Sequence, residues 1–295
     1  MINAADDIAL SESICFRQKI YRPLGRLMFL IRFIVIAVFT LFYSLDVYPQ
    51  QKIQDFYLSN YKEGGSKKWE VKGKEALVSG NYVDIDDMKA KYFQDNDTIN
   101  IRSDKAKLDK KNMDVYLKNN VYVNSEKGIT LHADALDWKQ SSNNISTNTK
   151  VNIEKEKSIK VDAKGMDADT ALSKVKFKKD VKVDLFRKDD VIKINCDGPL
   201  EIDYNKGVAV FNNNVVVDNV QGKMFARKAT VYFNSQDKTI AKVVAEGDVK
   251  VVRDDNVTFA DRAVYSEKKK KIVLEGRPRL VIFPKEKSKI FNIKK

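Results

Sequence analysis

Few side chains in this sequence are of the kinds that carry out chemistry. Its one histidine, His132, precedes Asp134 by two residues in the segment LHAD, and an imidazole beside a carboxylate could act as an acid–base pair. We favour a surface histidine on a strand, because no nucleophile, metal-binding or phosphate-loop motif accompanies it in the sequence. The 41 Asp and Glu residues fall mostly in turns or on polar strand faces, unlike the paired carboxylates of a glycan-cleaving site. We therefore expect no catalytic residue, no metal site, no cofactor and no enzymatic activity.

An apolar stretch of 19 residues, LMFLIRFIVIAVFTLFYSL, occupies positions 27–45. A helix that crosses a bilayer needs roughly 20 mostly apolar residues. The 13 residues after Arg32 would also suit the core of a signal peptide, but no small-x-small cleavage site follows them. We therefore expect an uncleaved transmembrane anchor over residues 25–46, with Arg32 reaching toward the near interface.

Basic residues before this stretch predict its orientation. Arg17, Lys19, Arg22 and Arg26 precede it, whereas Asp46 follows it. Because positively charged flanks stay on the cytoplasmic side, the N-terminus is expected in the cytoplasm and most of the chain outside it.

The formal net charge of +13 predicts an anionic partner, such as nucleic acid, a membrane surface or an acidic ligand. Export of most of the chain argues against nucleic acid and leaves an anionic lipid or glycolipid. The same topology places Cys15 and Cys196 on opposite sides of the membrane, so they are not expected to pair. Two cysteines support neither a disulfide framework nor a zinc site, and we expect Cys196 to be a small buried residue.

A short phrase returns along the chain at a nearly constant spacing. Its first apolar residue stands at Val121, Val151, Val181, Val215, Val249 and Leu280, at intervals of 30, 30, 34, 34 and 31 residues. Such a period is typical of stacked repeats. Apolar and polar residues alternate around each phrase, as in KVKFKKDVKVDLF at 174–186, which predicts strands with one apolar and one polar face.

Each repeated strand is expected to bend near its middle. Two residues before the aligned position stand Asn119, Thr149, Lys179, Asn213, Gly247 and Pro278, which are poor residues for a strand interior. Turn segments occur about twice per repeat, which predicts hairpin connections. The expected fold is mainly β, an elongated antiparallel meander folded over on itself with its apolar faces inward. A parallel β-helix is the alternative, but it would need three short strands per coil and more than the 12 glycines present.

The inward faces of such a meander would form an apolar trough. The shared parity assigns to it Val115, Leu117, Val121, Val123, Val151, Ile153, Val175, Phe177, Val181, Val183, Phe211, Val215, Val217, Val249 and Val251. Strand edges left open at the two ends invite pairing with other chains, and we expect this at Trp69–Val83 and at Ile272–Phe283.

Several segments carry a family resemblance. The chain contains KKWEVKGKEA at 67–76, INIRSDKAKLD at 99–109, VYLKNNVYV at 115–123, GITLHADALDW at 128–138 and ISTNTKVNI at 145–153. With a single N-terminal anchor before them, these segments resemble the LptC family of lipopolysaccharide export proteins. The segments VFNNNVVVDNVQGKMFARKATVYF at 210–233 and VVAEGDVKVVRDDNVTFADRAVY at 243–265 are similar to the repeats of LptA and the OstA-type domain.

The resemblance implies a domain order for the chain. It comprises a cytoplasmic tail at 1–24, the anchor at 25–46, a linker at 47–65, an LptC-like β-jellyroll lobe at 66–190, an LptA/OstA-like β-jellyroll lobe at 191–283, and a basic C-terminal tail at 284–295. The period changes from 30 to 34 near CDGP at 196–199, where we expect the seam between the lobes.

The resemblance also implies a function and partners. The chain would be a single-pass inner-membrane protein whose bulk lies in the periplasm. It would accept lipopolysaccharide from the inner-membrane ABC transporter of LptB, LptF and LptG, and pass it to LptA or outer-membrane LptD. Nucleic acid is not an expected partner. The alternative is a β-repeat scaffold or adhesin, anchored at the inner membrane, that carries no lipid.

Overall fold

The computed structural model describes residues 51–94, 97–156, 158–188, 190–234, 239–254, 256–269 and 271–282. The expected cytoplasmic tail, the expected anchor at 25–46, Cys15 and the expected C-terminal tail at 284–295 lie outside these ranges. Within them, no helix is long and apolar enough to cross a membrane.

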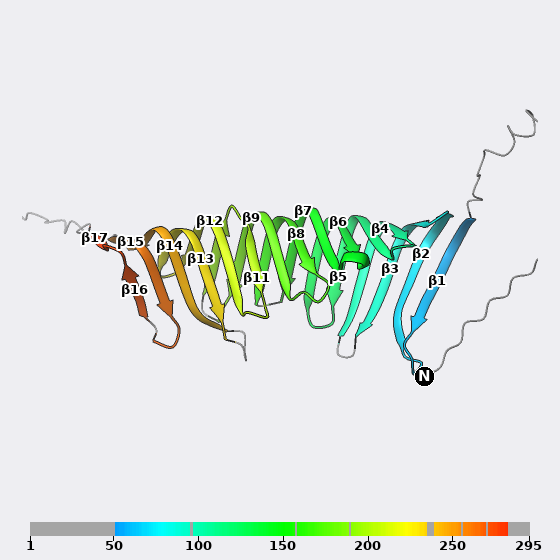
Figure 1. The fold of residues 1–295 in the computed structure, drawn as a ribbon, viewed down its shortest axis with the longest axis horizontal. Helices are drawn as coiled ribbons and strands as arrows, with labels where there is room; N and C mark the ends of the chain where they lie inside the picture. The colour runs from blue at the N-terminus through cyan, green and yellow to red at the C-terminus, as the bar shows by residue number, and fades with distance from the viewer. Residues whose placement is uncertain are drawn as a thin grey trace, which may run out of the picture. The chain divides into compact units, whose positions relative to one another are not determined.

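The described residues form one antiparallel sheet of 17 strands, which follow one another across the sheet in chain order (Figure 1). The elements are β1 (Gln51–Tyr61), β2 (Lys67–Ser79), β3 (Tyr82–Gln94), β4 (Asp97–Asp109), β5 (Asp114–Ser125), β6 (Ile129–Lys139), a 3-10 helix η1 (Gln140–Ser142), β7 (Asn144–Lys155), β8 (Ile159–Asp169), β9 (Lys174–Phe186), β10 (Val191–Cys196), β11 (Leu200–Asp203), β12 (Val208–Asn219), β13 (Gly222–Phe233), β14 (Ile240–Arg253), β15 (Asn256–Ser266), β16 (Lys271–Glu275) and β17 (Arg279–Ile282).

The pairing confirms the predicted antiparallel meander. Each strand from β1 to β9 pairs with the next one along the chain. Two short strands, β10 and β11, both pair with β9 and with β12, so they act as two halves of one strand. In the same way β16 and β17 both pair with β15.

The N-terminal end of the sheet differs from the expectation. β1 occupies residues 51–61, inside the range 47–65 that we expected to form a linker. It pairs with β2 along its length, from Gln51 opposite Val78 to Tyr61 opposite Lys67. The end strand is therefore β1 and not the predicted segment Trp69–Val83, which lies one and two strands further in. Apolar residues in β1 alternate weakly, and this is why the sequence pattern missed it.

The backbone confirms the predicted bends. Left-handed φ angles occur at Asn119 and Asn120 of β5, Asp180 of β9, Asn213 and Asn214 of β12, and Gly247 and Asp248 of β14. Asn, Asp and Gly are the residues that tolerate this conformation. The pairing skips residues at the same places, as between Lys118 and Val121 in β5. Thr149 lies within a similar skip from Thr147 to Lys150, and Pro278 lies in the break between β16 and β17.

Candidate lipid-binding trough and outer face

The structure places all 15 predicted trough residues on the buried side of the bent strands or half-buried beside it. Nine of them are buried: Leu117, Val121, Val151, Phe177, Val181, Val183, Phe211, Val215 and Val249. The other six are half-buried: Val115, Val123, Ile153, Val175, Val217 and Val251.

Most of these residues belong to one continuous apolar cluster. Its buried members run from Ala76 on β2 to Val231 on β13, so the cluster crosses most of the sheet. A second, smaller cluster contains Val249 with Ala226, Ala245 and Ala263. The trough residues are thus divided between a long cluster and a short one near the C-terminal end of the sheet.

Exposure within the trough rises away from the bend. In β5, Leu117 and Val121 flank the bend and are 4% and 1% exposed. Val115 and Val123, two residues further from it on either side, are half-buried. The apolar interior is therefore tightly packed along the bend and partly accessible toward the strand ends.

The sequence pattern missed the inward residues of the strands that run back between those carrying the repeated phrase. We call these the returning strands. In four of these strands, β6, β8, β13 and β15, two inward residues lie three positions apart across the bend: Ala133 and Leu136, Ala163 and Met166, Ala226 and Ala229, Ala260 and Ala263. A strict alternation of two residues fails across such a step. The signal that could have found them is a pair of apolar residues with any two residues between them. It occurs as ADAL, AKGM, ARKA and ADRA.

Outward-facing side chains form a row across neighbouring strands just beyond the bend. The pairing places in it Tyr57 of β1, Lys72 of β2, Lys89 of β3, Arg102 of β4, Tyr122 of β5 and His132 of β6. We call this set the outer row. The Arg102 guanidinium lies 4.2 Å from the centre of the Tyr122 ring, and the Tyr122 and His132 rings lie 4.5 Å apart. His132 is exposed, which confirms the prediction of a surface histidine on a strand.

A groove of about 860 Å³ crosses the outer face from β3 to β9 beside this row. Lys89, Arg102, Tyr122 and His132 line it, with Asp87 and other carboxylates on the side of the bend. Its lining mixes both signs of charge and, at the bend, also includes Val121 and Val151 of the trough.

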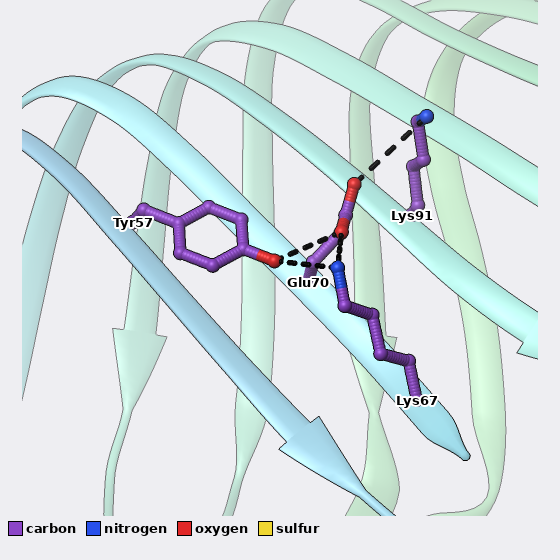
Figure 2. A network of polar contacts seen from close by, with 4 residues as sticks. All are labelled: Tyr57, Lys67, Glu70 and Lys91. Atoms are coloured by element: carbon purple, nitrogen blue, oxygen red, sulfur yellow. Dashed lines mark hydrogen bonds and ion pairs between the residues drawn. The ribbon is translucent and has the colours of Figure 1, made fainter.

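A network of four polar side chains lies at the N-terminal end of the outer face (Figure 2). The Lys67 ammonium donates to the Tyr57 hydroxyl and to Glu70 Oε2, each over 2.9 Å, and the Tyr57 hydroxyl donates to the same oxygen over 3.0 Å. Lys91 lies 3.9 Å from the other oxygen, Oε1. The hydrogen bond from Lys67 lowers the pKa of Glu70 although burial opposes this, and bonds to Tyr57 and Glu70 raise the pKa of Lys67.

Two further sequence expectations concern reactive groups. Cys196 is a free cysteine that is 5% exposed, as predicted, and burial raises the pKa of its thiol. No group of three or more His, Cys, Asp or Glu side chains in the described part of the chain could hold a metal ion.

Comparisons with known proteins find two family models along the chain. The model for lipopolysaccharide-assembly, LptC-related proteins matches residues 44–185, and the model for the LptA/(LptD N-terminal domain) LPS transport protein matches residues 193–292. A search of curated proteins found no significant match.

Among solved structures, the chain is similar to LptH from Pseudomonas aeruginosa, described as the LptA-homologous periplasmic component of the lipopolysaccharide transport device. The match has 13% identity, covers 63% of this chain and 95% of that one, and has a TM-score of 0.18. The two family models support the resemblance seen in the sequence: residues 44–185 match the LptC-related family of lipopolysaccharide assembly, and residues 193–292 match the LptA/LptD N-terminal domain family.

Proposed function

We propose that the chain is a membrane-anchored periplasmic carrier of lipopolysaccharide. It accepts the lipid from the inner-membrane ABC transporter of LptB, LptF and LptG, and passes it along the apolar trough toward LptA or outer-membrane LptD. The observation that carries this proposal is the apolar cluster that continues from Ala76 on β2 to Val231 on β13. Both family models, which describe lipopolysaccharide assembly and transport proteins, support it.

The physical reason for a trough is the cost of exposing acyl chains to water. Removing each CH₂ group from water stabilises the complex by about 0.8 kcal/mol. Half-buried residues such as Val123, Ile153 and Val217 leave apolar surface at which an acyl chain would replace water. Lys182 and other charged residues on the opposite face stay in solvent, so the carrier remains soluble along its length.

The proposal includes the expected topology and domain order. The anchor at 25–46 would hold the chain in the inner membrane with residues 1–24 in the cytoplasm. The LptC-like lobe at 66–190 and the LptA/OstA-like lobe at 191–283 would lie in the periplasm. An impermeant maleimide should then label a cysteine introduced at exposed Ser66 in intact spheroplasts, whereas buried Cys196 should stay unlabelled. Absence of labelling at position 66 would contradict this topology.

Photo-crosslinking in cells tests the carrier function. Inward Ile153 and Val217 are each half-buried, and their outward neighbours Glu154 and Val216 provide matched controls on the same strands. We expect lipopolysaccharide adducts from crosslinkers at 153 and 217 and not from those at 154 and 216. Equal adducts on both faces would refute the trough. Adducts at neither, in a folded chain that still binds its partners, would favour the scaffold or adhesin.

A further inference from the structure

Three cations of the outer row lie in direct register on adjacent strands. Lys72 of β2 is opposite Lys89 of β3, and Lys89 is opposite Arg102 of β4. Directly opposite side chains have Cβ atoms about 4.5–5.5 Å apart, and like charges in such positions destabilise a sheet. We call Lys72, Lys89 and Arg102 the cation row. Repulsion between these like charges destabilises the sheet, and a bound anion would reduce that repulsion.

The carboxylates near the cation row do not neutralise it. Glu70 is occupied by Tyr57, Lys67 and Lys91. Lys89 pairs with Asp87 over 3.2 Å, but these side chains are 62% and 60% exposed, and such surface pairs contribute little. Among the described residues no carboxylate forms an ion pair with Lys72 or Arg102.

Two tyrosines position the ends of the cation row. The Lys72 ammonium lies 5.5 Å from the centre of the Tyr57 ring, and the Arg102 guanidinium lies 4.2 Å from that of Tyr122. Cation–π contacts of this kind hold a charge in place without neutralising it. Lys89 and Arg102 also line the groove on the outer face, where a ligand has room.

We propose that the cation row is a binding site for a phosphate group on the outer face of the sheet. The Arg102 guanidinium would donate two hydrogen bonds to phosphate oxygens, and the two lysines would add compact positive charges. An anionic lipid headgroup and free phosphate share this chemistry. The apolar stretch at 27–45 ends six residues before β1, so the cation row lies within the first strands after it. The site does not depend on lipid transport in the trough, because it lies on the opposite face.

The test compares two triple variants of the full chain held in phosphatidylcholine nanodiscs. The first carries Lys72→Gln, Lys89→Gln and Arg102→Gln. The control carries Lys160→Gln, Lys193→Gln and Lys223→Gln, which removes the same charge from the outer face and leaves the lining of the groove unchanged. Each of these three lysines lies opposite an aspartate, Asp184 or Asp218, so none belongs to a row of like charges.

Two arms distinguish the sources of phosphate. In the first, sedimentation measures binding to phosphatidylcholine vesicles with and without phosphatidylglycerol. In the second, thermal unfolding is compared in potassium phosphate and in potassium chloride at equal ionic strength. Any general salting effect of phosphate is common to all variants, so the difference between the two triple variants reports the site.

If the site takes a lipid headgroup, wild type and control bind the anionic vesicles and the cation-row variant binds more weakly, by about fivefold for each removed charge. If it takes free phosphate, phosphate raises the unfolding temperature of wild type and control but not of the variant. Without phosphate the variant should be at least as stable as the control, because like charges have been removed. The proposal is overturned if neither arm separates the two triple variants, whatever crosslinking in the trough shows.

Discussion

The side-chain amide of Asn213 in β12 donates a hydrogen bond over 2.7 Å to the backbone carbonyl of Gly198, between β10 and β11. The neighbouring Asn212 amide donates to the carbonyl of Pro199 over 2.9 Å. Side chains at the bend of β12 thus donate hydrogen bonds to the backbone carbonyls at the break between β10 and β11. Because β9 and β12 both pair with the two halves, the sheet continues through the segment where the repeat period changes.

Replacement of Gly198 by alanine tests how tightly this break is packed. Gly198 has a φ of +96°, and a Cβ atom there would lie 2.6 Å from the backbone carbonyl oxygen of Lys178. The neighbour is backbone and cannot turn aside as a side chain would. We expect Gly198→Ala to lower the free energy of unfolding by at least about 1–3 kcal/mol, measured by urea denaturation.

Gly80→Ala is the matched control. Gly80 also has a positive φ, of +54°, but no atom lies within 4 Å of the place a Cβ would occupy. It should show only the conformational cost of a non-glycine residue at a left-handed φ, about 1–2 kcal/mol. Equal losses in the two variants would show that close packing at Gly198 has no effect of its own.

A new negative charge should destabilise the chain strongly at one residue of β9 and hardly at all at its neighbour. Val183 is 3% exposed and packs inside the sheet, whereas Lys182 is exposed on the other face. Val183→Asp buries an unpaired carboxylate and should cost about 3–5 kcal/mol of unfolding free energy. Lys182→Glu should change it by no more than about 0.5 kcal/mol. Chemical denaturation of both variants checks this, and a reversed order would mean that the strand faces are assigned wrongly.

These results show how far the sequence could specify the structure. The alternation around Val181 and the bends at Asn119, Asn213 and Gly247 depend on local backbone geometry, so sequence alone predicted them correctly. In β9 the residue with the left-handed φ is Asp180, one position after the predicted Lys179. Inward residues of the returning strands, such as Ala163 and Met166, were missed because their spacing changes across the bend. β1 was missed because its apolar pattern is weak.

The outer row could not be predicted for a different reason. Arg102 and Tyr122 are 20 positions apart in sequence and meet only through the pairing of β4 with β5. Each skip at a bend shifts the partners that follow it, so the pairing cannot be counted from strand lengths. The network around Glu70 has the same origin, since Tyr57 reaches it from β1.

Acid should weaken the N-terminal end of the sheet through Glu70. Its pKa in the folded chain is lowered, chiefly by the hydrogen bond from Lys67, below the value of about 4.3 expected when unfolded. The ionised carboxylate therefore contributes stability above the unfolded pKa, and this is lost as the pH falls through the folded pKa. Between about pH 5 and pH 3 the unfolding free energy of wild type should fall more steeply than that of Glu70→Gln.

Glu63→Gln provides the comparison for this experiment. Glu63 is exposed in the turn between β1 and β2, so its removal takes a carboxylate from the same region without touching the network. Its pH profile should run parallel to that of wild type. A Glu70→Gln profile that also ran parallel would show that this network does not contribute to acid sensitivity.

Both end strands of the sheet should pair with other proteins in the cell. Among the described residues β1 pairs only with β2, and β17 pairs only with β15, so each has one free edge. Exposed apolar residues gather there, including Leu58 at 55% and Val281 at 40% exposure. Open edges with apolar side chains favour strand addition. We expect a photo-crosslinker at 58 to capture the periplasmic part of the transporter, and one at 281 to capture LptA or LptD.

A photo-crosslinker at Met113 distinguishes pairing at a free strand edge from nonspecific hydrophobic contact. It is 48% exposed, similar to Leu58 and Val281, but it lies in the turn between β4 and β5, away from both end strands. Because a turn offers no row of unpaired backbone groups, a crosslinker at 113 should capture neither partner. Adding Leu58→Pro or Val281→Pro in an otherwise wild-type chain removes a backbone donor from an end strand and should weaken co-purification of the corresponding partner only. Crosslinks of equal yield at 58, 113 and 281 would argue that exposure alone, and not the free strand edge, selects the contact.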